Sequence, residues 1–153
     1  MSAVRSLAMK KKIALLITFA VCVIGAAAWF IVYNAQRTSA VADARDTLNR
    51  YLAVAVSSAQ RDGLAGLAAA EEDWQEMYPD GRMTVIASDG RVLIDSKADA
   101  GELENHYTRG EVISAFKTGE GFELRYSKTL EAWQVYSARK AVLPSGAECV
   151  VRL

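Results

Sequence analysis

Acidic residues are absent from the first 33 positions of this chain. All 18 Asp and Glu come after Tyr33, whereas Arg5 and Lys10 to Lys12 come before it. The formal net charge of zero therefore combines a basic N-terminal end with an acidic remainder. In that remainder the Lys and Arg are scattered singly, so the chain lacks the basic patch of a nucleic-acid-binding protein. We expect no nucleic-acid partner.

Charge of either sign is also absent from residues 13–33. As a helix rising about 1.5 Å per residue, this run would span roughly 31 Å, which matches the ~30 Å hydrocarbon core of a bilayer. A helix is required there because lipid cannot satisfy open backbone groups. Trp29, Phe30 and Tyr33 gather at its C-terminal end, where aromatic rings favour the interface. The run predicts a single transmembrane helix, with the lipid bilayer as partner.

The three lysines before the run predict which side of the membrane each end occupies. We expect residues 1–12 to be cytoplasmic, residues 13–33 to cross the bacterial cytoplasmic membrane and residues 34–153 to lie outside. A cleaved signal peptide is the competing interpretation, and Ala40-Val41-Ala42 offers a cleavage site. The apolar run exceeds the about 7–15 residues usual in signal peptides, so we favour a retained helix.

Cysteine is scarce, with Cys22 inside the apolar run and Cys149 near the C-terminus. One at membrane depth and the other in an outer domain cannot form a bridge within one chain. Two lone cysteines also lack the spacing of a metal site. We interpret both as small apolar side chains.

Proline is absent before Pro79, and glycine is absent between Tyr33 and Gly63. The intervening residues 34–61 are rich in alanine and leucine, which favours a continuous helix. A stripe at heptad spacing runs along it: Val41, Ala44, Leu48, Tyr51, Ala55 and Ser58. Two heptads leave open whether this stripe pairs with a second copy or packs on its own domain.

The glycines at 63 and 66 predict a bend, and a second helix is expected over residues 64–77. After the breaker at residues 78–81 the pattern changes to short strands. An Asp-Gly turn joins residues 83–87 to residues 92–95, and consecutive apolar positions in both predict that both faces are covered. A short helix at residues 111–117, closed by Gly119, precedes three strands: residues 121–127, 132–139 and 148–153. These elements predict an α+β fold in which the leading helix covers one face of an antiparallel sheet.

Catalytic groups are few. His106 is the only histidine, no Gly-rich phosphate loop follows a strand, and the carboxylates near His106 are too few for a metal site. We expect no enzyme activity in this chain, no metal and no cofactor.

Polar side chains among the apolar strands form the candidate site. Its residues are Asp95, Ser96, Asn105, His106, Arg109, Glu111, Arg125, Tyr126 and Ser127. One interpretation is structural: Arg109 or Arg125 pairs with Asp95 or Glu111, while Ser and Asn fix the long connection. The other is a pocket where guanidinium and imidazole groups meet a small anionic or carbonyl ligand. The two interpretations can hold together.

The same segments carry a family resemblance over roughly residues 35–141. They are residues 82–86 (RMTVI), 89–93 (DGRVL), 95–96 (DS), 104–106 (ENH), 125–127 (RYS), Arg109, Glu111, Gly119, Gly121 and Tyr136. In this order they resemble the outer sensor domain of bacterial phosphate-regulon-type sensor histidine kinases. Gly110 stands where that family usually has proline. The resemblance implies a PAS-like sheet of about five strands behind a long helix, a dimer, and a signalling role.

Two functions follow as hypotheses. The first, which we favour, is the membrane-anchored sensor module of a two-component histidine kinase, whose kinase part is absent from this sequence. The second is a single-pass scaffold whose outer domain binds another envelope protein. A reading frame that continues into a second apolar segment and a kinase would favour the first.

Overall fold

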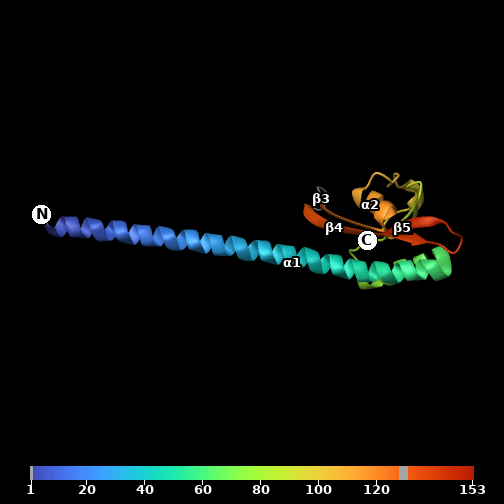
Figure 1. Ribbon diagram of the computed structural model, residues 1–153, viewed down its shortest axis with the longest axis horizontal. Helices are drawn as coiled ribbons and strands as arrows, with labels where there is room; N and C mark the ends of the chain where they lie inside the picture. The colour runs from blue at the N-terminus through green and yellow to red at the C-terminus, as the bar shows by residue number, and fades with distance from the viewer. Residues whose placement is uncertain (1, 128–130) are drawn as a thin grey trace. The chain divides into compact units, whose positions relative to one another are not determined.

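The computed structural model describes residues 2–127 and 131–153, with side chains from Met9 onward. The chain forms two compact units, residues 1–42 and 43–153, which are described separately. The helices and strands are α1 (Ser2–Met77), β1 (Thr84–Ala87), β2 (Val92–Asp95), the 3-10 turn η1 (Ala100–Glu102), α2 (Gly110–Thr118), β3 (Glu120–Ser127), β4 (Ala132–Val142) and β5 (Glu148–Arg152) (Figure 1).

The first unit consists of the N-terminal part of α1. Every described side chain from residue 9 to residue 40 is exposed, including Leu15 at 73% and Trp29 at 75%. By length and composition this helix is apolar enough to cross a membrane. A contiguous apolar surface of this size is unfavourable in water, so it requires lipid or another apolar partner around it.

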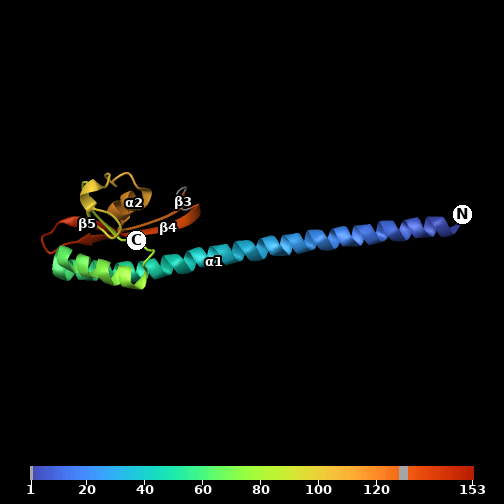
Figure 2. The same cartoon turned by 180° about the vertical axis from the view of Figure 1, so that it is seen from behind.

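The second unit begins on the same helix, which reverses direction at Gly63. Gly63 has φ 64° and ψ −138°, a backbone conformation that side chains with a Cβ rarely adopt. The bend divides this part of α1 into a first arm, residues 43–62, and a second arm, residues 64–77. The Tyr51 hydroxyl on the first arm donates to the carbonyl of Ala70 on the second, so the arms lie side by side (Figure 2). The predicted bend and second helix are confirmed.

The five strands form one antiparallel sheet in the order β2-β1-β5-β4-β3. The chain therefore places its last strand at the centre, between β1 and β4. Figure 1 shows the sheet between α1 on one side and α2 on the other. The predicted α+β fold is confirmed, as is the closure of the short helix by Gly119. The strands differ from prediction mainly at the C-terminal end of β4, which runs on to Val142.

The face of the sheet toward α1 is packed by both arms. Leu52 and Ala55 of the first arm and Leu67 of the second are fully buried in one cluster with Val85 and Val151 of the sheet. Leu48 and Tyr51 pack against the same cluster. The heptad stripe of α1 therefore packs on its own domain at these positions.

The opposite face carries a smaller core. Ile86 and Val150 are fully buried there with Val112 and Ala115 of α2. Because successive strand residues point to opposite faces, neighbours such as Val150 and Val151 enter different cores. This two-sided burial confirms the expectation drawn for β1, whose Val85 and Ile86 divide between the faces in the same way.

Candidate functional site

A buried carboxylate lies at the start of α2, between two arginines of the sheet. The side chain of Glu111 is 0% exposed. Its Oε2 accepts from Arg125 Nη2 of β3 at 3.1 Å, and its Oε1 lies 3.2 Å from Arg152 Nε of β5. A buried carboxylate is stable only with such partners, so α2 is fixed to the sheet by charge as well as by apolar packing.

Both arginines lie against one aromatic ring. Both guanidinium carbons, those of Arg125 and Arg152, lie 4.7 Å from the centroid of the Tyr136 ring on β4. Guanidinium groups favour aromatic faces, because the face of the ring carries negative electrostatic potential. Tyr136 thus stabilises both of the cations that share the Glu111 carboxylate.

Arg152 is not fully satisfied by this arrangement. Its side chain is 9% exposed, and its Nη1 has no hydrogen-bond acceptor among the described residues. Glu111 Oε1 likewise accepts no hydrogen bond there, because the 3.2 Å contact with Arg152 Nε is poorly aligned. Unpaired buried polar atoms are rare in folded proteins, and each one needs a physical explanation.

A second carboxylate lies beside the first. Glu123 of β3 is paired with Arg125 at 3.2 Å and is 36% exposed. Burial raises the pKa of Glu111, and its hydrogen bond with the Glu123 carboxyl raises that pKa further, against the opposing effect of Arg152 and Arg125. The neighbouring Glu123 carboxyl thus disfavours a second full negative charge beside it.

Glu123 also serves the N-terminus of α2. Arg109, in the N-cap position, makes no side-chain cap hydrogen bond. The Glu123 carboxylate lies beside this turn instead, and the Glu111 carboxyl, Arg125 and the backbone N–H of Glu111 together lower its pKa. A carboxylate is favourable there because the first turn of a helix carries unpaired N–H groups and a partial positive charge. Gly110 leaves room for this contact, since a Cβ at that position would lie 2.9 Å from Glu123 Oε2.

Helix α2 approaches β3 so closely that a side chain at Gly121 would not fit. A Cβ on Gly121 would lie 1.8 Å from the carbonyl oxygen of Glu111. Because backbone atoms cannot move aside cheaply, this glycine sets the distance between α2 and the sheet, and so the position of Glu111.

Further cations surround the buried pair. Arg109 is half-buried and forms no ion pair among the described residues. Its charge acts on both His106 and Arg152, and so does that of Arg82. Burial lowers the pKa of His106 first, and the positive charges of Arg152, Arg109 and Arg82 lower it further, although the carbonyl of Glu104 opposes them.

Asp95 and Ser96, predicted as site residues, brace the end of the first hairpin. Arg82 Nε donates to both carboxylate oxygens of Asp95, at 3.0 and 2.9 Å, and the Thr84 hydroxyl and the Lys97 N–H also donate to them. Ser96 Oγ accepts from the Met83 N–H. Burial alone would raise the pKa of Asp95, but these hydrogen bonds outweigh it and lower the pKa.

Asn105 and His106 hold the long connection against the hairpin turn. Asn105 Nδ2 donates to the Asp89 carbonyl at 2.8 Å, and its Oδ1 accepts from the Tyr107 N–H. His106 is buried, and its backbone N–H donates to the Gly90 carbonyl. Its ring Nδ1 lies 2.7 Å from the Glu104 carbonyl oxygen. The structural interpretation of these residues is therefore supported by their hydrogen bonds.

The predicted residues are not all brought together. Arg109, Glu111, Arg125 and His106 gather at the start of α2. Tyr126, by contrast, is 47% exposed and contacts Trp133 on β4 with ring centroids 5.7 Å apart. Ser127 ends β3 beside it. Arg125 does pair with Glu111 as predicted, while Asp95 pairs with Arg82 instead of Arg109 or Arg125.

Four contributors to the site are not among the residues predicted for it: Arg82, Glu123, Tyr136 and Arg152. Arg152 left a detectable signal, since it is the one charged residue after Glu148 in a last strand of apolar residues. A charged residue within a strand that is covered on both faces indicates a buried polar partner. Glu123 left none, because alternation in β3 fits an exposed polar face equally well, whereas Tyr136 is among the residues that carry the family resemblance.

The chemistry of these groups suits binding. The described residues contain no group of three or more His, Cys, Asp or Glu able to hold a metal ion. They do contain several guanidinium groups around few carboxylates. Such an arrangement recognises anions. We call Arg109, Glu111, Glu123, Arg125, Tyr136 and Arg152 the arginine cluster.

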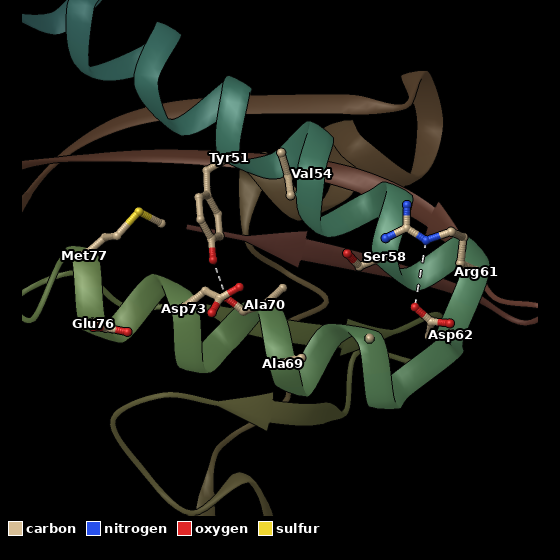
Figure 3. Close-up of a pocket in the computed structure, with 11 residues that line it drawn as sticks. Tyr51, Val54, Ser58, Arg61, Asp62, Ala69, Ala70, Asp73, Glu76 and Met77 are labelled. Carbon is tan, nitrogen blue, oxygen red and sulfur yellow. Dashed lines mark hydrogen bonds and ion pairs between the residues drawn. The ribbon is translucent and has the colours of Figure 1, made fainter.

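A groove of about 650 Å³ lies elsewhere, between the two arms of α1 (Figure 3). Apolar Val54 and Met77 line it, with Asp62, Asp73 and Glu76 as acidic members. In the close-up, Tyr51 reaches across it toward Ala70. Burial raises the pKa of Tyr51 to about 12, and nearby Asp73 adds to that rise.

Comparison with known proteins yields structural similarity alone. No family model and no curated protein matches the chain. The ligand-binding domain of the Campylobacter jejuni chemoreceptor Tlp3, in complex with 4-methylisoleucine, matches 74% of this chain at a TM-score of 0.53 and 12% identity. A methyl-accepting chemotaxis protein from Vibrio parahaemolyticus matches 78% of this chain and 93% of that one at a TM-score of 0.48 and 15% identity.

The chain spans about half of the Campylobacter domain, 52% of its length. At 12% identity this likeness concerns the fold, a long helix followed by a five-stranded antiparallel sheet. The fold of this chain is similar to that of the Campylobacter ligand-binding domain.

Proposed function

We propose that this protein is a membrane-anchored extracytoplasmic sensor module. The observation that carries the proposal is that one element, α1, supplies both an exposed apolar stretch able to cross a membrane and one wall of the core of a sensor-type fold. A stimulus that alters the packing of the sheet on the arms of α1 would thereby act on the element that enters the membrane.

The proposed mechanism is a shift between two packings. A ligand or partner changes the equilibrium between them only if it binds one more tightly than the other. Sliding or rotation of the first arm against the sheet is the expected difference, since packed helices move in small discrete steps. The resemblance to phosphate-regulon-type kinases supports a dimer whose output is a two-component histidine kinase.

The orientation is proposed from the charge pattern: residues 1–12 inside and residues 34–153 outside the cytoplasmic membrane. Single cysteines in a Cys22→Ser/Cys149→Ser background test it. A membrane-impermeant maleimide added to intact spheroplasts should label Ser57→Cys, an exposed position of the first arm, but should label Lys11→Cys only after permeabilisation. The reverse pattern, or release of a soluble chain trimmed after Tyr33, would contradict the proposal.

Signalling is tested by crosslinking in native membranes. Cysteines placed singly from residue 36 to residue 46 should give a helical pattern of crosslinked dimers, and inducing conditions should shift that pattern along the helix. Identical patterns in both conditions, or no dimers at any position, would count against a sensor that transmits through α1.

A scaffold function has one specific observation in its favour. The groove between the arms exposes Val54 at 60% and Met77 at 56% beside acidic side chains, which suits a partner protein. If Val54→Asp abolishes capture of an envelope partner while crosslinking stays unresponsive to any stimulus, the scaffold function is the better description.

A further inference from the structure

Arg152 is a buried cation with an unused donor. Its side chain is 9% exposed, while its Nη1 has no acceptor among residues 9–127 and 131–153. A guanidinium loses its hydrogen bonds to water on burial. Only acceptors for all of its N–H groups compensate for that loss. The free Nη1 therefore marks a place for an acceptor atom that the described chain does not supply.

The arginine cluster carries more positive than negative charge. This cluster holds three arginines, Arg109, Arg125 and Arg152, but only two carboxylates, those of Glu111 and Glu123. Arg109 has no acidic partner in the described part of the chain. An anion entering this cluster would meet an excess of cationic groups.

The start of α2 adds a second feature of an anion site. Helix N-termini bind anions through free N–H groups. Here the Glu123 carboxylate lies at the first turn, 2.9 Å from where a Cβ on Gly110 would be, and it is 36% exposed. A carboxylate of the protein thus already occupies the place that a ligand carboxylate would take, and its exposure gives it room to leave.

We propose that the arginine cluster binds a small oxyanion, a carboxylate or a phosphate, with Arg152 Nη1 and Arg109 as donors and with displacement of Glu123 from the start of α2. This site rests on the proposed sensor function and assigns a class of ligand to it. The ligand is small, because only a slender group reaches a side chain that is 9% exposed.

Displacement of Glu123 gives binding a structural consequence. Glu123 leaves both Arg125 and the first turn of α2, so the ligand replaces a contact between β3 and this turn. The bound and free states would therefore differ in how α2 is held on the sheet, which is the differential contact that a signal requires.

The test uses the full chain in lipid nanodiscs, titrated with sodium acetate and, separately, with inorganic phosphate at constant ionic strength. The single imidazole of His106, next to the cluster, reports binding by NMR. Saturable shifts are expected with at least one anion. Saturation by acetate alone assigns a carboxylate ligand, by phosphate alone a phosphate ligand, and by both a general oxyanion site. Shifts equal to those of sodium chloride overturn the proposal.

Three variants sharpen the result. Arg109→Gln keeps both partners of Glu111, so it should fold, yet it should weaken binding about tenfold through loss of one charged hydrogen bond. Glu123→Gln removes the competing negative charge and should bind more tightly than the wild type. Arg61→Gln, an exposed arginine on the first arm, is the matched control and should bind as the wild type does.

Unchanged affinity in both Arg109→Gln and Glu123→Gln would overturn the site even if an anion binds elsewhere. Arg152→Met should abolish binding, and its folding is checked independently by circular dichroism. The result is separable from the sensor proposal, because maleimide topology and dimer crosslinking are read without any ligand. A correct topology with no anion binding rejects the site alone.

Discussion

Ser137 on β4 donates its hydroxyl to Oδ1 of Asn49 on α1 at 2.7 Å, joining two residues 88 positions apart. Ser137 is buried, at 1% exposure, and lies on the sheet face that packs against the first arm. Apolar side chains make up most of this interface and can slide, whereas a hydrogen bond between two fixed positions sets a register. The pair therefore fixes where the first arm sits along the sheet.

The first prediction concerns this pair. Asn49→Ala leaves the buried Ser137 hydroxyl without its partner and should lower the free energy of unfolding by about 1–3 kcal/mol. The double variant Asn49→Ala/Ser137→Ala should lose less than the sum of the two single variants. Urea titrations followed by tryptophan fluorescence measure both. Gln60→Ala, an exposed position of the same arm, is the control. Strict additivity would show that the hydrogen bond contributes nothing to stability.

The second prediction concerns Glu111. Glu111→Ala removes the common partner of Arg125 and Arg152 and should cost about 3–5 kcal/mol, as expected when one member of a buried ion pair is deleted. Glu111→Gln retains a polar acceptor of similar size and should cost less. Thermal melts of both variants are compared with that of Glu72→Ala, a control at an exposed position of the second arm. Equal losses for the alanine and glutamine variants would show that side-chain volume, not hydrogen bonding, is what Glu111 supplies.

The third prediction is a pH dependence. The pKa of His106 is lowered from 6.5 by burial and by the charges of Arg152, Arg109 and Arg82, so the folded state binds this proton less readily than the unfolded chain does. Stability from this source is present above the unfolded pKa and is lost as the pH falls below about 6.5 toward the folded value. Proton NMR of the only imidazole should give a midpoint below 6.5.

Asp95 acts in the same direction at lower pH. Its folded pKa lies below 3.8, so its contribution to stability disappears as the pH falls through the range beneath that value.

Arg152→Met should move the His106 midpoint upward, because it removes one of the three repelling cations. A His106 midpoint at or above 6.5 in the wild type would mean that the ring is hydrated and lies away from the arginines.

The fourth prediction tests the close approach of α2 to β3. Gly121→Ala places a Cβ 1.8 Å from the Glu111 carbonyl oxygen and should cost at least about 1–3 kcal/mol, since the helix has to move off the strand. Gly101→Ala is the matched control, because its Cβ would meet Asp99 Oδ1 at 3.4 Å, an ordinary contact. Comparable melting temperatures for the two variants would show that α2 is loosely seated.

Much of the fold followed from local pattern. Several signals act within a few residues: the breakers at Gly63 and Pro79, the Asp-Gly turn at residue 90 and the alternation in the later strands. Their effects can therefore be predicted from the local sequence. The apolar run at residues 13–33 is similarly local, because its length alone is matched to a bilayer.

The heptad stripe shows where local pattern stops. Its spacing predicted one apolar side on the helix but left two partners open. Leu48, Tyr51 and Ala55 pack on the domain's own sheet, and only the complete sheet, with β5 at its centre, provides that surface. The spacing of apolar residues specifies which face of a helix is buried, but it does not specify which surface covers that face.

By itself, then, the sequence determined the membrane-length apolar helix and the order of elements, and it offered Arg125 with Glu111 as one of several possible pairs. The tertiary structure alone decided that Arg152 and Glu123 join that pair around Tyr136. The reason is that strands distant in sequence are brought into register by backbone hydrogen bonds that carry no side-chain identity. Which charges meet across a sheet is thus fixed only once all five strands are in place.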